Sequence, residues 1–429
     1  MRILYVCDKL ITFILNEVIE LKANHDVKIL AYYSERIFSS ITEPILIKNG
    51  LDKNYFRYRS SRFPERKKRQ FDFIKMMVHD FLRHPVQTLK AVHFILKNYQ
   101  NLRSGFIDYY DVRDMLDQKI DIIHSPFSTP EVIDKVYLLS EILNVPFTLC
   151  FRAHDIYHGK TFAEVKKRRH AIKKASRLIT ISAYNEKQLR GMIDIDGPIE
   201  IIHSSLYPDF FKPDESIERS HNAILSVCRL TEHKGVIHLV EACHILHKRN
   251  IDYECTIIGE GPVIDTYKKS IDEKISTLQI PNITFMNYMT YDKIREYLSR
   301  STVFVLPCVI APDGQRDILA NSLKEAMAMK IPVVTSHICG IEELVDDGIS
   351  GILTRPEDPE DIADAIEKIF SHPELAKEMG EEGRRKIEKD FNTRFEAGKL
   401  EEIFRNVIGH ERTLDIYSEN KSIMNEIIE

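Results

Sequence analysis

The chain has 429 residues, of which 43% are hydrophobic and 29% charged, and its formal net charge at pH 7 is −5. This length predicts two domains, each large enough for its own core. The negative net charge argues against a nucleic-acid-binding protein, and no apolar run is long enough to span a membrane.

Seven cysteines are scattered singly along the chain and form no CxxC pair. A zinc site and a disulfide framework are therefore not expected. The candidate aspartates Asp8, Asp155 and Asp317 are too dispersed along the sequence to indicate a bound metal. The first residues, MRILYVC, carry no cleavable signal pattern. We expect a protein of the reducing cytosol that needs no metal.

The N-terminal part begins with a strand, a helix and a second strand. Residues 2–6 form a short apolar run, residues 13–21 have helical periodicity, and residues 27–32 are apolar again. This order opens a doubly wound α/β domain. The turn after the first strand, at 7–10, contains no glycine, which disfavours a nicotinamide-dependent enzyme.

A basic run at 57–69 contains a single acidic residue, Glu65. Two amphipathic helical segments come next, at 74–81 and 89–99, separated by Pro85. The simpler interpretation is a helical hairpin whose charges face water. The alternative is a basic surface that rests on anionic lipid headgroups, where each positive charge contributes about 1 kcal/mol.

The remaining strands predict a second domain of the same architecture. Apolar runs predict strands at 121–124, 147–150, 177–182 and 200–203, and, after a linker at 204–222, at 223–227, 254–258, 283–285, 303–306, 331–335 and 351–353. We therefore predict an α/β fold of two doubly wound, Rossmann-like domains with an interdomain cleft. The expected division is an N-terminal domain at 1–205 with a basic helical segment at 57–105, a C-terminal domain at 206–390, and a helical segment at 391–429 that packs back toward the N-terminal domain.

Two carboxylates, Asp317 and Glu325, lie between the strands predicted at 303–306 and 331–335. Eight residues are about two helical turns, so on one helix both side chains would share a face about 12 Å apart. Two such acceptors could hold the hydroxyls at the two ends of an extended ligand, such as a sugar nucleotide. A helix cap and a solvated helix face are the alternative explanations.

Two cations, Arg229 and Lys234, follow the strand predicted at 223–227 and precede Gly235. At the carboxyl end of a strand, together with the backbone donors of the next helix, they could clamp a diphosphate. Two surface cations are the alternative interpretation.

Three further positions could belong to a site. Gly259 and Gly261 end a strand and suit a close approach of the backbone to a ligand, although a tight turn explains them as well. His154 is expected to end a strand of the N-terminal domain and to face the cleft, unless its role is structural.

Together these motifs resemble glycosyltransferase family 4, whose members have the GT-B fold. The resemblance rests on an RLxxxKG element from Arg229 to Gly235, a GxGP turn from Gly259 to Pro262, an ExxxxxxxE motif with Asp317 and Glu325 at its ends, a glycine-containing stretch from Gly340 to Gly351, an HGxD-type segment from Phe151 to Tyr157, and an opening at Thr12-Phe13-Ile14 with Glu17 that is similar to exopolysaccharide transferases.

The resemblance implies transfer of a sugar from a nucleotide donor with retention at the anomeric carbon, without a metal or cofactor. It assigns Arg229 and Lys234 to the departing phosphate, Glu325 to the ribose and Asp317 to the donor sugar. It assigns His154 to the sugar or the acceptor, Gly259, Gly261, Ile318 and Leu319 to the donor, and Asp155 and Phe13 to the acceptor side. The sequence departs from the family pattern where Asp317 replaces glutamate, where Cys228 replaces glycine, at Ser204-Ser205, and after the first strand, where the glycine-rich loop is absent.

The predicted function is therefore a cytoplasmic glycosyltransferase that builds a surface or lipid-linked glycan. Its expected partners are a nucleotide-sugar donor and a glycan or polyprenyl-linked acceptor, with an anionic membrane at the inner face as a further candidate and no nucleic acid. The alternatives are a sugar-nucleotide epimerase or phosphorylase on the same fold, and a non-catalytic member of a glycan-assembly complex.

Overall fold

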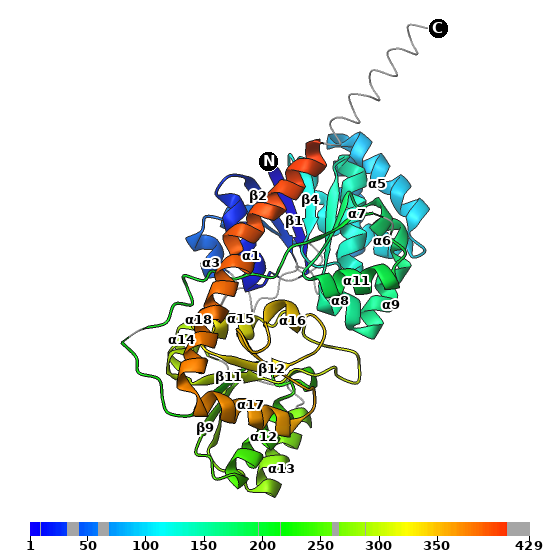
Figure 1. Cartoon of the computed structure of the whole chain (residues 1–429). Helices are drawn as coiled ribbons and strands as arrows, with labels where there is room; N and C mark the ends of the chain where they lie inside the picture. Colours follow the sequence, from blue (N-terminus) through cyan, green and yellow to red (C-terminus); the bar gives the residue numbers. More distant parts are fainter. Residues whose placement is uncertain are drawn as a thin grey trace.

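The computed structural model describes residues 1–8, 10–31, 43–58, 68–195, 197–214, 216–259, 266–287 and 289–409, with the side chains left out at 12, 43–44 and 68–74. Within these residues the chain forms two parallel β-sheets, one above the other in Figure 1, each with helices on its faces. The predicted α/β fold of two doubly wound domains is confirmed.

The N-terminal sheet has the strand order β3-β2-β1-β4-β5-β6-β7, and every neighbouring pair is parallel. Its strands are β1 Arg2–Cys7, β2 Asp26–Ala31, β3 Tyr55–Arg57, β4 Ile122–Ser125, β5 Phe147–Phe151, β6 Arg177–Thr180 and β7 Ile199–Ile201. The central strands are continuous apolar runs because helices cover both faces of the sheet.

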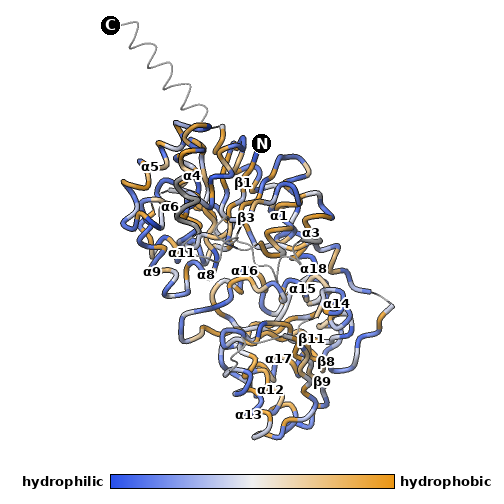
Figure 2. Tube along the Cα trace, turned by 180° about the vertical axis from the view of Figure 1, so that it is seen from behind, coloured by the Kyte–Doolittle hydropathy of each residue, from blue (hydrophilic) through white to orange (hydrophobic). Residues whose placement is uncertain are grey.

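The helices of this domain are α1 Thr12–Lys22, α3 Glu43–Lys48, α4 Lys68–Arg83, α5 Pro85–Asn98, α6 Leu102–Val112, α7 Pro130–Leu143, α8 Ala153–Tyr157, α9 Gly159–Lys167, α10 Arg169–Lys174 and α11 Ala183–Met192, with 3-10 turns η2 Asp52–Asn54 and η4 Arg113–Asp117. Proline at the first turn of α7 and left-handed Asn144 after its last turn set the bounds of that helix. Helices α4 and α5 lie on the outer side of the domain in both views (Figures 1 and 2).

The C-terminal sheet has the order β10-β9-β8-β11-β12-β13 and is also entirely parallel. Its strands are β8 Ala223–Val227, β9 Glu254–Ile258, β10 Ile283–Met286, β11 Val303–Leu306, β12 Val333–Ser336 and β13 Gly351–Thr354, and its helical segments are η5 Glu232–Lys234, α12 Val236–Lys248, α13 Thr266–Leu278, α14 Tyr291–Arg300, α15 Asn321–Ala328, α16 Ile341–Leu344, α17 Pro359–Ser371 and α18 Pro373–Asp390. The strand order reverses between β8 and β11, which is where doubly wound sheets bind their ligands.

A last helix at residues 393–409, drawn in red in Figure 1, runs along the N-terminal domain. The ring of Phe404 lies 5.2 Å from the ring of His124 on β4. Oε1 of Glu401 lies 3.2 Å from Nε2 of His25. The chain therefore crosses back from the C-terminal sheet to the N-terminal one, and this helix ties the two domains together.

Candidate active site

A pocket of about 700 Å³ opens at the carboxyl ends of β8, β9 and β11, where the strand order of the C-terminal sheet reverses. It is lined by Ile11, Val227, Cys228, Arg229, Lys234, Ile258, Gly259, Tyr291, Ile294, Asp317, Leu319, Ala320, Asn321, Ser322 and Glu325. Ile11, just before α1, is contributed by the N-terminal domain, so the pocket lies between the domains. Both predicted cations and both predicted carboxylates are brought together here.

The segment after β8 places the two cations. The turn η5 ends in Gly235, which has a left-handed φ of 64°, and a Cβ there would lie 1.8 Å from the backbone oxygen of Pro307. Only glycine fits, and the tight turn directs Lys234 into the pocket. The exposed side chain of Arg229 lines the same pocket and forms no hydrogen bond or ion pair with the residues that the structure describes.

Lys234 and Asp317 form an ion pair across the pocket wall, with Nζ 2.6 Å from Oδ2. The thiol of Cys308 donates to the same carboxylate oxygen at 3.4 Å. Burial raises the pKa of Asp317, but the charges of Lys234 and His233 outweigh it and hold that pKa below its usual value. The pKa of Lys234 is raised, because the carboxylate outweighs the effect of burial. Both groups are therefore charged at neutral pH.

The prediction that Asp317 and Glu325 share one helix is wrong. Helix α15 begins at Asn321, and Asp317 lies in the preceding loop. That loop turns at Gly314, which has φ 89°, and a hydrogen bond of 3.0 Å from the Val309 N–H to the His233 carbonyl holds its start against η5. The loop therefore positions the Asp317 carboxylate next to Lys234, and helical spacing plays no part in it.

Glu325 points from α15 into the pocket, and its side chain is half-buried. Burial raises the pKa of its carboxyl to about 7, although the neighbouring Lys324 opposes this shift. Lys324 is fully buried and donates to the backbone oxygen of Ser204. No described residue donates a hydrogen bond to the Glu325 carboxylate, so its oxygens are available to a ligand.

Three predicted donor residues have different surroundings. Gly259 lines the pocket with φ 156°, and a Cβ there would lie 1.7 Å from the backbone oxygen of Cys228. Leu319 also lines the pocket, whereas Ile318 is buried against Gly340 outside the lining. The fourth predicted residue, Gly261, lies outside the described residues.

The predicted acceptor-side residues do not line this pocket. Strand β5 ends at Phe151, so the expectation that His154 ends a strand is wrong: it is exposed on α8, with its ring stacked on His158 at 4.8 Å. Asp155 is fully buried, where burial raises the pKa of its carboxyl to about 7, and it accepts from the backbone N–H of Arg152 at 2.9 Å. Phe13 stacks under the Arg152 guanidinium at 4.5 Å.

Two contacts join the domains beside the pocket. The Glu343 carboxylate of α16 accepts from the backbone N–H groups of Ala183 and Tyr184, each at 2.8 Å, at the start of α11. The guanidinium of Arg316 lies over the ring of Tyr157 at 4.5 Å. A negative carboxylate at a helix N-terminus is favourable, so Glu343 helps to fix the relative position of the domains.

Sequence reasoning missed several lining residues. Tyr291 and Ile294 belong to α14, which follows β10, and Ile11 precedes α1. Each follows the carboxyl end of a parallel strand, and that position is the signal that could have found them.

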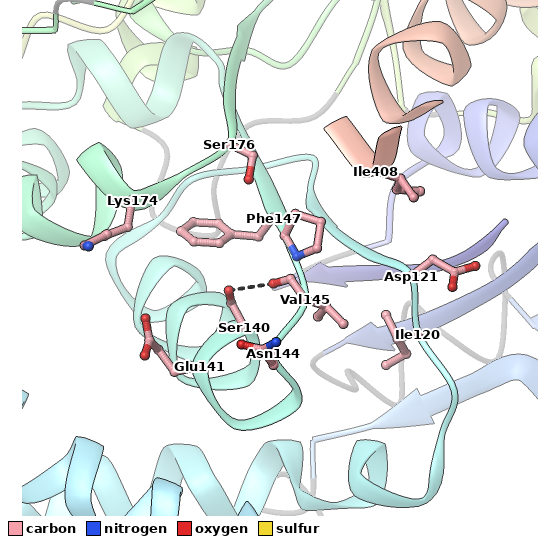
Figure 3. A pocket seen from close by; sticks show the side chains of 11 residues that line it. Ile120, Asp121, Ser140, Glu141, Asn144, Val145, Phe147, Lys174, Ser176 and Ile408 are labelled. Carbon is pink, nitrogen blue, oxygen red and sulfur yellow. Dashed lines mark hydrogen bonds between the residues drawn. The ribbon is translucent and has the colours of Figure 1, made fainter. Parts of the chain in front are cut away.

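A second pocket, of about 350 Å³, lies in the N-terminal domain, next to the residues that precede β4, β5 and β6 (Figure 3). Its lining includes residues 144–147 before and at the start of β5, Ser176 before β6, and Ile408 of the last helix. Ser140 donates to the Val145 carbonyl at 2.7 Å within it. None of the predicted site residues lines this pocket, and it lies at the amino ends of the strands, away from the usual ligand edge.

Within the described part of the chain, no group of three or more His, Cys, Asp or Glu residues is placed to hold a metal ion. No helix there is long and apolar enough to cross a membrane. All seven cysteines are free thiols.

Residues 209–386 match the family of glycosyl transferases group 1. The chain carries a group 1 glycosyltransferase domain. This domain contains all four charged residues of the pocket. The predicted resemblance to glycosyltransferase family 4 is confirmed, and the prediction of a transferase enzyme is confirmed at the level of the family.

Among curated relatives, an amylovoran biosynthesis glycosyltransferase, AmsK of Erwinia amylovora, is 33% identical over 181 residues, which are 42% of this chain and 44% of the relative. The chain spans about half the length of the curated relatives it matches. Among solved structures, a glycosyltransferase from Rickettsia africae superposes with a TM-score of 0.69 at 19% identity, covering 95% of this chain and 98% of that one. Anabaena Alr3699/HepE in complex with UDP-glucose gives 0.68 at 14% identity, covering 94% and 99%. The glycosyltransferase domain thus belongs to a chain of GT-B fold.

Proposed function

We propose that this chain is a retaining, metal-independent glycosyltransferase that moves a sugar from a nucleotide-sugar donor to a glycan or lipid-linked glycan. One observation carries the proposal: a single pocket contains the Lys234–Asp317 ion pair together with the Arg229 guanidinium and the Glu325 carboxylate, which have no side-chain partner among the described residues. Cations suit a diphosphate and carboxylates suit sugar hydroxyls. The UDP-glucose bound by HepE supports a nucleotide-sugar donor, and the role of AmsK in amylovoran biosynthesis supports a polysaccharide product.

In the proposed complex the donor extends along the pocket. Its diphosphate binds Arg229 and Lys234, its ribose hydroxyls donate to Glu325, and its sugar lies against Asp317. The ion pair with Asp317 keeps Lys234 protonated and aimed into the pocket before the donor arrives. Lys234 is thus in place when the phosphate binds.

The transfer step breaks the bond between the anomeric carbon and the phosphate oxygen, and the electron pair leaves with the phosphate. The acceptor hydroxyl oxygen bonds to the anomeric carbon on the face from which the phosphate leaves. The proton of that hydroxyl passes to the departing phosphate oxygen. Negative charge grows on the phosphate as the bond breaks. Fixed positive groups at that position lower the barrier, and one such group is typically worth about 100-fold or more in rate.

The acceptor would enter from the N-terminal side, at residues 1–205, past α1 and α8, which carry Phe13, His154 and Asp155. The donor domain would be 206–390, and the segment at 391–429 would join the two. We place the protein in the cytoplasm, with contact to the inner face of the membrane where lipid-linked acceptors are found.

The proposal can be tested without knowing the donor in advance. Thermal shift with UDP-, GDP- and ADP-sugars identifies the donor class, and the matching donor is then incubated with and without acceptor in the presence of EDTA. We expect a glycoside that keeps the anomeric configuration of the donor, measured by NMR. An epimer formed from the donor alone, release of sugar phosphate with inorganic phosphate, or no donor binding would each contradict the proposal.

A further inference from the structure

The outer face of α4 and α5 is unusually apolar for a surface. Half of the large hydrophobic side chains that are exposed in the described part of the chain lie on these two helices: Val78, Phe81, Leu82, Val86, Leu89 and Leu96. Leu82 is 77% exposed, and Val86, Leu89 and Leu96 are about 60% exposed. Exposed apolar residues gathered in this way mark an interaction surface.

The spacing of these residues places them on one side of each helix. On α4, Val78 and Leu82 are four residues apart, and on α5, Val86, Leu89 and Leu96 follow at intervals of three and seven. His84 alone separates the two helices, so the two stripes meet there. In Figure 2 both helices form part of the outer rim of the N-terminal domain.

The core does not need this apolar face. Helix α5 already buries a second apolar face, which includes Ala91, Phe94 and Ile95, and Phe94 contacts the ring of Tyr137 on α7 at 4.8 Å. A helix that is apolar on both sides has one side left for another partner.

Among the side chains that the structure describes on these two helices, the exposed lysines are not accompanied by an exposed acid. Lys75, Lys90 and Lys97 are exposed, and the described side chains of α4 and α5 include one acid, Asp80, which is buried and paired with Arg113. Among the described residues, Lys90 and Lys97 have no ion-pair partner. The face therefore combines apolar side chains with cations, although the whole chain carries a net charge of −5.

We propose that this face, named here the docking face (Val78, Phe81, Leu82, Val86, Leu89 and Leu96 with Lys75, Lys90 and Lys97), lies on the anionic surface of a lipid bilayer. Apolar side chains enter the boundary between headgroups and acyl chains, and lysines on the same helices bind anionic headgroups. The basic run predicted as the lipid-facing surface is a different segment, and its residues 59–67 lie outside the described residues.

A second copy of the chain fits the docking face less well. A two-fold contact sets the same surface against itself, so a face that carries lysines would pack against a second face that carries lysines. No exposed acid on the described part of α4 and α5 is available to pair with them. The charge of the face is complementary to an anionic surface and not to its own copy.

Vesicle flotation tests the docking face. Wild-type protein is mixed with phosphatidylcholine vesicles that contain or lack phosphatidylglycerol, and we expect it to float with the anionic vesicles. Lys90→Gln with Lys97→Gln should weaken partitioning about 30-fold, at about fivefold for each lysine. Leu82→Ser with Leu89→Ser should also weaken it.

Matched variants on the C-terminal side of the chain serve as controls. Lys368→Gln with Lys377→Gln removes two exposed lysines elsewhere, and Ile349→Ser with Phe395→Ser removes two exposed apolar side chains elsewhere. These controls should float like the wild type. Thermal melting shows whether each variant is folded.

The proposal is overturned if the wild type does not float with anionic vesicles, floats equally with neutral ones, or if the docking-face variants float like the wild type. It is also overturned if light scattering shows a wild-type dimer that these variants lose, because a second copy would then cover the face. The proposal rests on the membrane contact in the proposed function and names the surface that would make it. Its test is separate from the test of sugar transfer. Calorimetry with a UDP-sugar on the same variants should give unchanged binding, so a failure of docking and a failure of donor binding are distinguished.

Discussion

Lowering the pH from 8 to 6 should weaken donor binding about tenfold through protonation of Glu325. The carboxylate lines the pocket without a hydrogen-bond donor among the described residues, and burial raises its pKa to about 7. Ribose hydroxyls donate to the ionised form, so the affinity is fully present above that pKa and is lost as the pH falls through it. The apparent Kd is multiplied by 1 + 10^(pKa − pH), which is about 11 at pH 6 and about 1.1 at pH 8.

Isothermal titration calorimetry with a UDP-sugar measures this effect, because the diphosphate of a UDP-sugar has no group that titrates in this range. Lys324, whose pKa is lowered to about 7 mainly by burial, titrates in the same range with the opposite effect, since its ammonium attracts the diphosphate at low pH. The diagnostic comparison is therefore with Glu325→Gln, which keeps Lys324. We expect the variant to bind the donor more weakly than the wild type at pH 8. Its affinity should not fall as the pH is lowered from 8 to 6. Superimposable pH profiles for the two proteins would refute the assignment of Glu325 to the donor.

Three further predictions concern the residues around the pocket. Lys234→Ala should lower kcat about 100-fold or more and leave Asp317 without its cation, which steady-state kinetics and a stopped assay of UDP release can measure. Gly235→Ala should destabilise the fold by more than about 2 kcal/mol, because the new Cβ would lie 1.8 Å from a backbone oxygen, whereas Gly398→Ala, in open space on the last helix, should leave the melting temperature unchanged or raised. Glu343→Ala should speed hydrogen exchange at the start of α11, since two N–H groups lose their acceptor, and unchanged exchange there would contradict the interdomain contact.

Much of the fold could be predicted from the sequence, because buried parallel strands are short, continuous apolar runs. The strands from β8 to β13 lie within two residues of their predicted bounds, and β8, β9 and β11 agree at both ends. Strand β3 was missed, because its three residues are half-buried and include an arginine. Helices α8 to α10 were missed because the segment from 153 to 174 has short helices with no sustained helical period.

The charged residues of the pocket could be predicted because each follows a strand of a parallel sheet, where ligands bind. The geometry of these residues could not be predicted from the sequence. The spacing of Asp317 and Glu325 fits one helix, but the turn residues Pro312-Asp313-Gly314 precede Asp317, and the loop continues to Asn321, where α15 begins. The ion pair with Lys234 joins residues 83 positions apart, and no local pattern encodes such a contact.

We expect the guanidinium of Arg229, which has no partner among the residues that the structure describes, to bind the diphosphate of a nucleotide-sugar donor. Calorimetric titration of UDP into the wild type and Arg229→Ala tests it most directly. Loss of a charge-assisted, two-pronged contact of about 2 kcal/mol predicts about 30-fold weaker binding. Arg355→Ala, at an exposed arginine paired with Asp361, serves as the matched control and should bind like the wild type. Equal UDP affinity in the wild type and Arg229→Ala would contradict the claim.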